Sequence, residues 1–359
     1  MKKAKASNSL DGMTENQQDL YNVYLQKKTV EMCGKLKKLE YGDHCSLIVP
    51  SPILTGFRNR AKFKIFHEKK SIRIMGTDPI RGEVPAEDSL WIIPEWGRAC
   101  VREIYEIISD EYQKCPVDGF EIQLTHGRQE CHVILSVKKR ASGFYEELSE
   151  TLIENITWLK GVAVPSLKME FGEMFLKHSI FEWDIFAHYL AFFQSNFHLI
   201  PKLLFNVRSS LNRASFKRIV DLYCGVGFFS LNLRAQAKEI FGVDSSKWAV
   251  ESAVINGKYL DLNQTNFKCT SVEKFLDTFP LSKDDVIFLN PPRQGVSPVV
   301  IETIASQRPH TICLVSCSLE THLRDLKLWR DSGYSIRSFA AFDMFPFTNF
   351  LETVTVLES

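Results

Sequence analysis

The stretch that decides the fold is TICLVSCSLET, residues 311–321. Its apolar run is typical of a buried parallel strand, and Cys317 stands at the end of that run. Ser318 is a residue type that begins helices, and the apolar spacing from Leu323 to Trp329 predicts an amphipathic helix directly behind it. Cys317 is therefore expected where a strand gives way to a helix, which is where open α/β sheets hold their ligands.

This position allows two interpretations of Cys317. A helix N-terminus stabilises a thiolate, which is the reactive form of cysteine. A cysteine is also a small apolar side chain that fills protein cores, and without other context this is the simpler interpretation. The rest of the sequence has to decide between a nucleophile and a packed thiol.

Composition narrows the class of protein. The chain has 359 residues, 45% of them apolar, and a net charge of +1. This length predicts about two domains, and no apolar run approaches the ~20 residues that a membrane-spanning helix needs. Residues 7–18 are polar where a secretory signal needs an apolar segment, so we expect a cytoplasmic protein without membrane contact. The nine cysteines form no Cys-x-x-Cys pair, which predicts core thiols rather than a metal site or a disulfide framework.

From residue 218 onward, apolar strands alternate with helical segments. The expected strands are residues 219–223, 239–244, 286–290 and 311–317, with two more between 342 and 356. This alternation predicts an α/β fold with a doubly wound, mostly parallel sheet. The first half instead mixes hairpins and helices, and it predicts an α+β accessory region. We expect three segments: residues 1–40 (tail and helix), 41–175 (accessory region) and 176–359 (α/β domain).

The accessory region contains a row of basic side chains. Basic and apolar residues alternate from Gly56 to Phe66, so that one face of a strand would carry the cations. These cations are Arg58, Arg60, Lys62 and Lys64. They are interpreted either as an ordinary solvated face or as a strand that grips phosphates, since aligned like charges repel unless a polyanion neutralises them.

A glycine turn follows the first strand of the α/β domain. In Asp221–Ser230 the strand ends in Gly225-Val226-Gly227, which lets the backbone approach a ligand closely. A dinucleotide site would want a third glycine where Ser230 stands, which argues against a nicotinamide oxidoreductase. Asp244 ends the next strand, where a carboxylate can accept both hydroxyls of a ribose. Together with Asp221, this pattern favours S-adenosylmethionine, which has a ribose but no phosphate.

Two further polar positions are candidates for ligand contact. Asn290-Pro291-Pro292-Arg293 ends a strand, and Asn290 can read the edge of a base or of the cofactor because it has donor and acceptor capacity. An aromatic ring usual after such a motif is replaced here by Arg293, which weakens an interpretation as an amino-group methylase. Gln194 lies in the aromatic segment 181–197, which is mostly core, and its amide must find partners or face a pocket.

These motifs together resemble the family of S-adenosylmethionine-dependent RNA 5-methyluridine methyltransferases, over nearly the whole chain beyond residue 20. Within it the chain is similar to the ribosomal-RNA branch, which has an asparagine at the first position of the Asn290-Pro291-Pro292-Arg293 motif. The resemblance is carried by Gly56–Lys62, Phe192–Asn196, Asp221–Gly227, Asn290–Arg293, Ser316-Cys317 and Asp343–Pro346 with Glu352. It implies a Rossmann-like class I methyltransferase domain preceded by an α+β RNA-recognition region.

The resemblance also implies roles for single residues. Cys317 falls on the nucleophile and Glu352 on the general base. The positions that hold the cofactor and the target base are Gln194, Tyr223, Gly225, Asp244 and Asn290. Carbon 5 of uracil is a poor nucleophile, so a thiolate adds to carbon 6 to activate it, and a base later removes the carbon-5 proton. The target nucleotide must leave its stack to reach such a site.

The sequence departs from the family pattern in three places. The N-terminal cysteines lack the spacing that holds a [4Fe–4S] cluster in this branch, so we expect no cluster and no other metal. Phe347 and Phe350 stand where histidines are common before the base, which puts the tuning of Glu352 in doubt. Ser271 stands where an aspartate often contacts adenine.

The expected function is methylation of uridine carbon 5 in RNA, with 23S ribosomal RNA as the substrate and a monomer as the simplest state. One alternative is the same reaction on transfer RNA. Another is an RNA-binding homologue that has lost catalysis through the changes at Phe347 and Phe350. The basic row from Arg58 to Lys64 is expected to bind the RNA.

Overall fold

The computed structural model describes residues 15–69, 71–110, 117–137, 142–211 and 216–359. The expected N-terminal tail lies outside these residues. None of the helices in the described part has the length and apolarity needed to cross a membrane.

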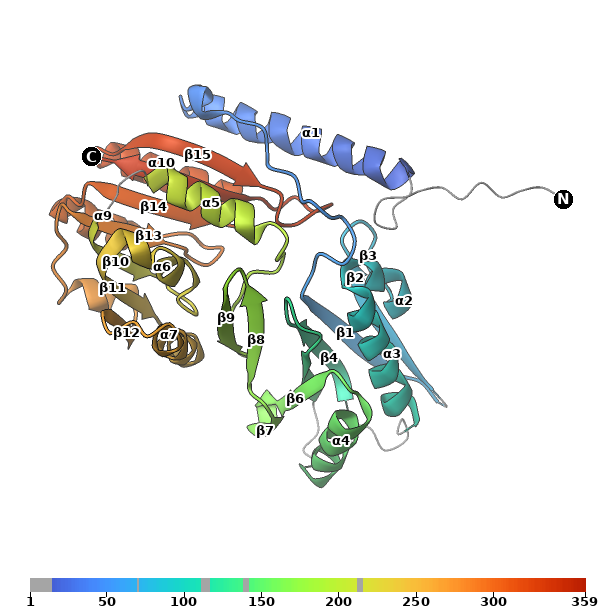
Figure 1. Ribbon diagram of the computed structural model, residues 1–359. Coiled ribbons are helices and arrows are strands. Elements are labelled where there is room, and N and C mark those ends of the chain that lie inside the picture. Colours follow the sequence, from blue (N-terminus) through green and yellow to red (C-terminus); the bar gives the residue numbers. More distant parts are fainter. Residues whose placement is uncertain (1–14, 70, 111–116, 138–141, 212–215) are drawn as a thin grey trace.

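The second half of the chain forms the doubly wound sheet that the sequence predicts. Its strands are β10 (Phe216–Leu222), β11 (Ala237–Asp244), β12 (Thr265–Cys269), β13 (Asp285–Leu289), β14 (Thr311–Ser316), β15 (Ser335–Phe342) and β16 (Glu352–Glu358). They lie in the order β12-β11-β10-β13-β14-β16-β15, seen as the yellow-to-red sheet in Figure 1. The first five strands are parallel, and β16 pairs antiparallel with both β14 and β15. The predicted α/β class is therefore confirmed.

Helices cover both faces of this sheet because successive strand residues point to opposite sides. On one face Val286 and Phe288 of β13 pack with α5 and α6, and on the other face Ile287 and Leu289 pack with α9 and α10. The helices are α5 (Ile200–Leu211), α6 (Phe228–Asn232), α7 (Lys247–Tyr259), α8 (Val272–Leu276), α9 (Pro298–Gln307) and α10 (Leu319–Asp331). The predicted helix after Cys317 is α10; Ser318 occupies its N-cap position, but the Ser318 side chain makes no capping hydrogen bond.

Helix α1 (Glu15–Lys38) packs on the α/β domain, and Figure 1 shows it lying along the side of β15. Met32 and Leu36 are fully buried in the core that contains α9 and α10. The chain after α1 stays on the same core through Ile48. The division of the chain at residues 40 and 175 stays a prediction.

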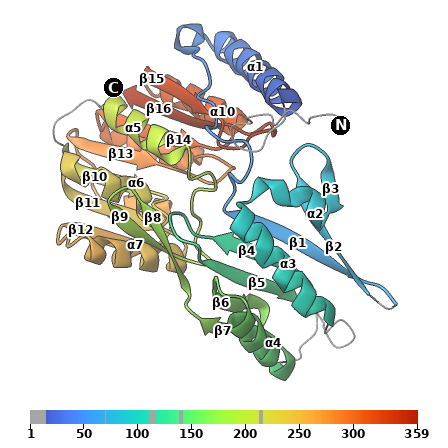
Figure 2. The same cartoon turned by 45° about the vertical axis from the view of Figure 1, so that its right-hand side comes forward.

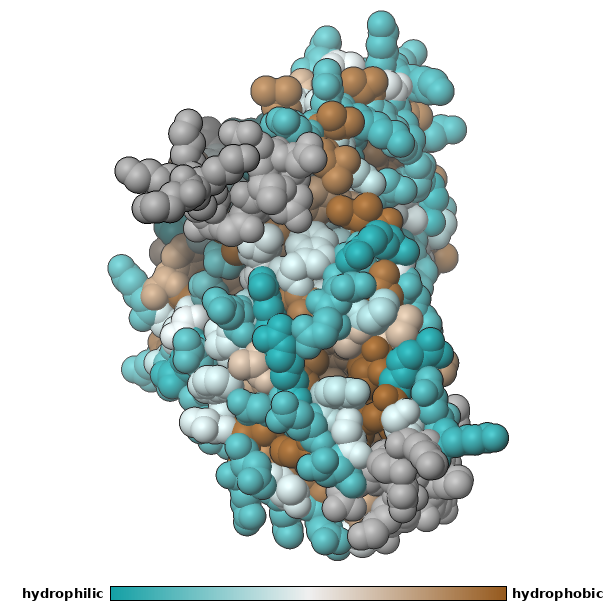
Figure 3. Space-filling view, turned by 90° about the vertical axis from the view of Figure 1, so that its right-hand side faces the viewer, coloured by the Kyte–Doolittle hydropathy of each residue, from teal (hydrophilic) through white to brown (hydrophobic). Residues whose placement is uncertain are grey.

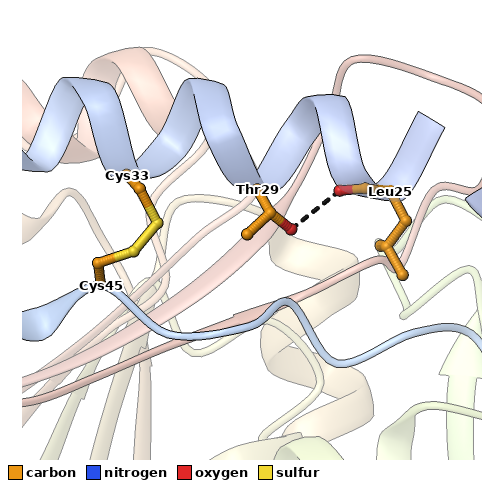
Figure 4. Close-up of a disulfide and its surroundings, with 4 residues drawn as sticks. All are labelled: Leu25, Thr29, Cys33 and Cys45. Atoms are coloured by element: carbon orange, nitrogen blue, oxygen red, sulfur yellow. Dashed lines mark hydrogen bonds between the residues drawn. A yellow bond between two sulfur atoms is a disulfide. The ribbon is translucent and has the colours of Figure 1, made fainter. Parts of the chain in front are cut away.

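A disulfide joins α1 to the chain that follows it. Cys33 and Cys45 are bonded, with their Cα atoms 5.2 Å apart, and Figure 4 shows the bond beside Thr29, whose hydroxyl donates to Leu25 O. The expectation of unpaired thiols is wrong for this pair, since sequence spacing did not reveal that a helix face and a returning loop meet. In the described residues no cluster of three or more metal-ligating side chains occurs. The lack of an iron–sulfur cluster stays a prediction.

The accessory region is built on a second sheet. Its strands are β1 (Arg60–His67), β2 (Ile72–Asp78), β3 (Gly82–Pro85), β4 (Val117–Leu124), β5 (Cys131–Val137), β6 (Leu159–Val164) and β7 (Met169–Gly172), in the order β3-β2-β1-β4-β5-β6-β7. The helices are α2 (Ala86–Ser89), α3 (Glu95–Asp110) and α4 (Ser142–Asn155). Apolar residues of α3 and α4 share one core with the sheet, and Figure 2 shows both helices in front of it.

A two-stranded hairpin connects the two regions. It consists of β8 (Phe175–Ile180) and β9 (Trp183–His188). The side-chain amide of Asn256 on α7 bonds both the N–H and the carbonyl of Phe186 in β9, at 2.8 and 3.0 Å. The same Asn256 amide donates to Val226 O in the glycine turn, at 2.9 Å. The hairpin is thereby tied to the edge of the sheet where the candidate site lies.

Candidate active site

The register of the parallel strands brings the predicted site residues to one edge of the sheet. Leu222 of β10 lies opposite Val243 of β11 and Leu289 of β13, and Leu289 lies opposite Leu314 of β14. Asp244, Asn290 and the end of β14 therefore follow at neighbouring positions. The carboxyl ends of such strands are the usual place for a ligand.

The glycine turn has the backbone conformation that a ligand cradle needs. Tyr223, Gly225 and Gly227 have φ of 70°, 54° and 77°. A Cβ atom at Gly227 would come within 2.9 Å of Leu231, so glycine is required there. A Cβ at Gly225 would meet nothing within 4 Å, because that side of the turn faces open space.

Asp244 holds the turn from the next strand. One carboxylate oxygen accepts the Gly225 N–H at 3.0 Å and the other accepts the Ser246 N–H at 2.8 Å. These bonds fix the orientation of the carboxylate and leave lone pairs for further donors. These contacts place the Asp244 carboxylate directly beside the glycine turn.

Asp221 is a buried carboxyl group behind the turn. Burial raises its pKa to about 7, and the charge of Asp244 adds to this rise. Hydrogen bonds from Ser230 act in the opposite direction. One of its oxygens has no hydrogen-bond partner in the described structure. Ser230 stands where a dinucleotide motif has its third glycine. Its role here is structural, because it hydrogen-bonds the Asp221 carboxyl group.

Gln194 is brought to the same region by its neighbours. Its main-chain carbonyl accepts from the Asn59 side chain at 3.2 Å. The ring of Phe193 meets that of Phe228, the first residue after the glycine turn, edge to face at 5.4 Å. Gln194 is buried between the accessory region and the turn, as a candidate for ligand contact requires. Ser271 instead caps α8, where its hydroxyl accepts from Lys274 N at 3.3 Å.

Cys317 and Glu352 meet at the end of an antiparallel strand pair. Ser316 of β14 lies opposite Thr353 of β16, and the Thr353 hydroxyl donates to Ser316 O at 3.1 Å. Cys317 and Glu352 are the next residues outward on the two strands. Glu352 is 2% exposed. A thiol and a carboxyl group are therefore adjacent, although 35 positions separate them in the sequence.

Burial shifts the proton equilibria of both groups. The pKa of Cys317 is raised, first by burial and then by Glu352, while Arg293 opposes the rise through its charge and a hydrogen bond. Burial therefore opposes the thiolate form of Cys317, and Arg293 supports it. Burial also raises the pKa of Glu352 to about 8.

Arg293 is a site residue that the sequence interpretation missed. Arg293 lies in the loop after β13, three residues after Asn290. From the sequence, it was interpreted only as the replacement of an aromatic ring. Its contact with Cys317 crosses from the loop after β13 to the end of β14. Only the position of a basic residue three places after Asn290 could have suggested this.

The loop that leads to Glu352 is held by α1. The ammonium group of Lys28 donates to the Asp343 carboxylate at 2.5 Å, to Phe345 O at 3.3 Å and to Phe350 O at 3.1 Å. Both members of the ion pair are buried. Helix α1 thus fixes the segment that leads to Glu352.

Removing Lys28 should therefore loosen this loop and destabilise the fold. Lys28→Met leaves a buried Asp343 carboxylate without its partner, and we expect the free energy of unfolding to fall by about 3–5 kcal/mol. Lys27→Met, on the exposed side of the same helix, should change it by less than about 0.5 kcal/mol. Urea denaturation of the two variants measures the difference. Equal effects of the two substitutions would contradict this role of Lys28.

Phe347 occupies an aromatic cluster rather than a polar one. Its ring contacts those of Tyr21, Tyr24 and Trp91 with centroid distances of 5.5, 5.9 and 5.7 Å. A histidine at this position would have an apolar surrounding. Phe347 therefore packs the loop against α1 and the accessory region.

The four basic residues of the predicted row do not form one free cationic face in the structure. Lys62 and Lys64 alternate with buried residues in β1 as expected, but Arg60 and Lys62 pair with Glu121, and Lys64 pairs with Glu83. Arg58 precedes the strand and forms an isolated bridge with Asn196. Its pKa is lowered by burial and by the charge of Arg293, so it faces the candidate site. Glutamates on neighbouring strands, invisible in the local pattern, neutralise most of the row.

Comparison with known proteins finds RNA methyltransferases that are similar to this chain. A family model described as tRNA (Uracil-5-)-methyltransferase matches residues 185–359. An uncharacterized RNA methyltransferase of Caldanaerobacter subterraneus is 32% identical over 204 residues, which cover 57% of this chain and 45% of that protein. One of Nanoarchaeum equitans is 28% identical over 330 residues, covering 87% and 71%. The chain thus spans less than half the length of the first of these relatives.

A solved structure extends the likeness to the fold of nearly the whole chain. It is the Pyrococcus abyssi tRNA (uracil-54, C5)-methyltransferase in complex with S-adenosyl-L-homocysteine, with a TM-score of 0.71 and 22% identity, covering 94% of this chain and 83% of that one. This chain therefore shares the fold of that solved structure over nearly its whole length. The segment that the family model matches, residues 185–359, is just under half of the chain and contains the glycine turn, Asp244, Asn290, Cys317 and Glu352, so this part of the chain is similar to that family.

Proposed function

We propose that this protein methylates carbon 5 of uridine in RNA with S-adenosylmethionine as the methyl donor. The observation that carries the proposal is the meeting of Cys317 and Glu352 beside the turn that Asp244 holds. A thiol, a carboxyl group and a ribose-binding carboxylate at one sheet edge suit attack on a pyrimidine followed by proton removal.

The residues present suit the cofactor. Asp244 can accept the ribose hydroxyls, Gly225 leaves open space beside the backbone, and the unpartnered oxygen of Asp221 can receive a donor group. Gln194 and Asn290 are proposed to contact the cofactor or the target base. S-adenosylmethionine supplies an electrophilic methyl group when it is bound.

The chain's own residues carry the remaining steps. The Cys317 thiol releases its proton to solvent, and the thiolate sulfur bonds to carbon 6 of the uracil. The double bond between carbon 5 and carbon 6 opens into an enolate, which makes carbon 5 nucleophilic. Arg293 stands beside the sulfur as its cationic partner. After carbon 5 is methylated, the Glu352 carboxylate takes the carbon-5 proton, the bond to carbon 6 breaks, and the thiolate leaves.

A cleft next to the site suits RNA. It encloses about 840 Å³ and lies mainly in the accessory region, with Phe197 and His198 at its border with the α/β domain. Its lining includes Arg58, Arg98 and Arg128 together with Trp91 and Trp96. Cations that meet phosphates and rings on which bases stack are the features of single-stranded RNA grooves. Figure 3 shows that the face with α1 and part of the accessory region is mostly hydrophilic.

Within this function we propose 23S ribosomal RNA as the substrate, because of the asparagine at position 290. Transfer RNA is the second candidate, favoured by the tRNA description of the matching family model. Mapping 5-methyluridine in total RNA from cells with and without this protein tests both. Loss from 23S ribosomal RNA supports the first, loss from transfer RNA the second, and unchanged 5-methyluridine in every RNA contradicts the proposed reaction.

Asp244→Asn tests the cofactor site. The amide keeps the shape but removes the charge and one acceptor, so the Gly225 turn loses support and the ribose loses its partner. We expect the Kd for S-adenosylhomocysteine, measured by calorimetry, to rise about 10- to 100-fold. Asp277→Asn, at the exposed end of α8, is the matched control and should leave the Kd unchanged. A normal Kd for Asp244→Asn would place the cofactor elsewhere.

A further inference from the structure

Phe350 contacts the cation that stands beside the candidate nucleophile. The guanidinium carbon of Arg293 lies 4.2 Å from the centroid of the Phe350 ring. This distance is well within the range of an attractive cation–π contact. Phe350 is 38% exposed, so its ring is available at the surface of the site rather than enclosed in the core.

The backbone of Phe350 is fixed on both sides of the ring. Its N–H donates to the Thr348 hydroxyl at 3.2 Å, and its carbonyl accepts from Lys28 at 3.1 Å. The ring meets Phe345 edge to face at 6.1 Å. Phe350 therefore offers the guanidinium a surface of defined position.

The backbone around Arg293 is equally well held, but its side chain forms no ion pair within the described residues. Arg324 donates to Gln294 O at 2.9 Å, and the Asp325 carboxylate accepts the Val296 N–H at 2.8 Å. In the described part of the chain no carboxylate lies within ion-pair distance of Arg293, whereas Arg58 repels it. A long cationic side chain without an acidic partner needs another group to keep it in one orientation.

That orientation matters because of what Arg293 touches. The charged groups that act on the Cys317 sulfur are Glu352 on β16, which disfavours the thiolate, and Arg293, which favours it and hydrogen-bonds it. Of these two charged groups, only Arg293 favours the thiolate form of Cys317. If the guanidinium swings away, only a backbone hydrogen bond still opposes the effects of burial and Glu352 on the pKa of Cys317.

We propose that Phe350 is a positioning residue, which holds the Arg293 guanidinium against Cys317 through a cation–π contact. The inference rests on the proposed function only in taking Cys317 as the nucleophile. It gives a physical role to a phenylalanine found where the resemblance leads one to expect a histidine. A protonated histidine would repel the guanidinium, whereas a phenylalanine ring attracts it without taking up a proton.

The test measures Cys317 itself, without RNA or cofactor. The rate of Cys317 alkylation by iodoacetamide is followed from pH 6 to 10 by peptide mass spectrometry, because alkylation reports the thiolate. For Phe350→Leu we expect the rate at pH 7 to fall about 3- to 10-fold and the profile to move to higher pH. Phe350→Tyr keeps an aromatic face and should restore the rate to within about twofold.

Controls separate positioning from general damage. Phe205→Leu, a 74% exposed phenylalanine on α5, should leave the Cys317 profile unchanged. Arg293→Gln should slow alkylation at least as much as Phe350→Leu, and the double variant should be no slower than Arg293→Gln alone. A thermal scan of each variant shows whether the fold is intact, and the profile of a folded variant is then interpretable.

The proposal is overturned if folded Phe350→Leu has the wild-type pH profile, or if its loss adds in full to that of Arg293→Gln. These outcomes are distinct from a failure of the proposed function. A protein that forms no 5-methyluridine but whose Cys317 profile follows Phe350 would refute the reaction and keep the inference. An active enzyme whose profile ignores Phe350 would do the reverse.

Discussion

Cys317→Ser should abolish methyl transfer to RNA. A serine hydroxyl in the same place is far less nucleophilic than a thiolate, so the bond to carbon 6 of the uracil does not form. We expect kcat to fall by about 10⁴-fold or more. The measurement is transfer of a labelled methyl group to RNA from cells that lack the protein.

Cys269→Ser is the matched control for this substitution. Cys269 is exposed at the end of β12, and its replacement should leave kcat unchanged. Binding of S-adenosylhomocysteine should survive in both variants, since Asp244 and the glycine turn are untouched. A Cys317→Ser enzyme with more than a tenth of the wild-type rate would rule out a mechanism through this thiol.

Glu352→Gln should stop the reaction at a later point. The amide cannot take the carbon-5 proton, so the methylated base stays attached to Cys317 and protein–RNA adduct accumulates. We expect turnover to fall about 10²- to 10⁴-fold while the adduct appears on denaturing gels. Glu302→Gln, exposed on α9, serves as the control. Loss of turnover with no adduct would assign Glu352 to a step before or during attack.

The pKa of Glu352 also predicts the pH dependence of the enzyme. Only the carboxylate accepts a proton, and burial raises the pKa of this group to about 8, so the wild-type kcat should rise from about pH 6.5, reach half its maximum near pH 8 and level off above about pH 9.

The same pKa sets a stability difference between the wild type and Glu352→Gln. Because the folded pKa of about 8 exceeds the ordinary value of 4.5, the folded state holds the proton more tightly than the unfolded chain. The stability contributed by this group is full below pH 4.5 and is lost as pH rises through 8. Glu352→Gln should therefore be more stable than the wild type at pH 9, and this advantage should disappear at pH 5.

The sequence predicts the parts of the site that depend on local pattern. The strand ends that carry Asp244, Asn290 and Cys317 follow from apolar runs and turn residues, and parallel strands bring such ends together without further information. Glu352 required the family resemblance, because no local pattern tells that β16 returns antiparallel beside β14. The sequence predicted a doubly wound, mostly parallel sheet, but it did not predict the order of the strands.

Contacts between distant segments could not be predicted from local sequence patterns. Lys28 and Asp343 are 315 positions apart, and nothing in the amphipathic spacing of α1 marks that lysine as buried. Glu121 lies on β4, so its neutralisation of Arg60 and Lys62 depends on strand pairing across the accessory sheet. At Cys317, burial raises the pKa of the thiol and Arg293 lowers it, and the size of each effect depends on the packed structure.

The most direct test of the mechanism is covalent trapping with RNA that contains 5-fluorouridine. Fluorine at carbon 5 cannot leave as a proton does, so an enzyme that has added Cys317 to carbon 6 and transferred the methyl group remains bonded to the RNA. With S-adenosylmethionine we expect a protein–RNA band that survives denaturation, is absent in Cys317→Ser and maps to Cys317 by mass spectrometry. A folded protein that binds such RNA and the cofactor but forms no band with any cellular RNA sequence would contradict the account and favour an RNA-binding homologue without catalysis.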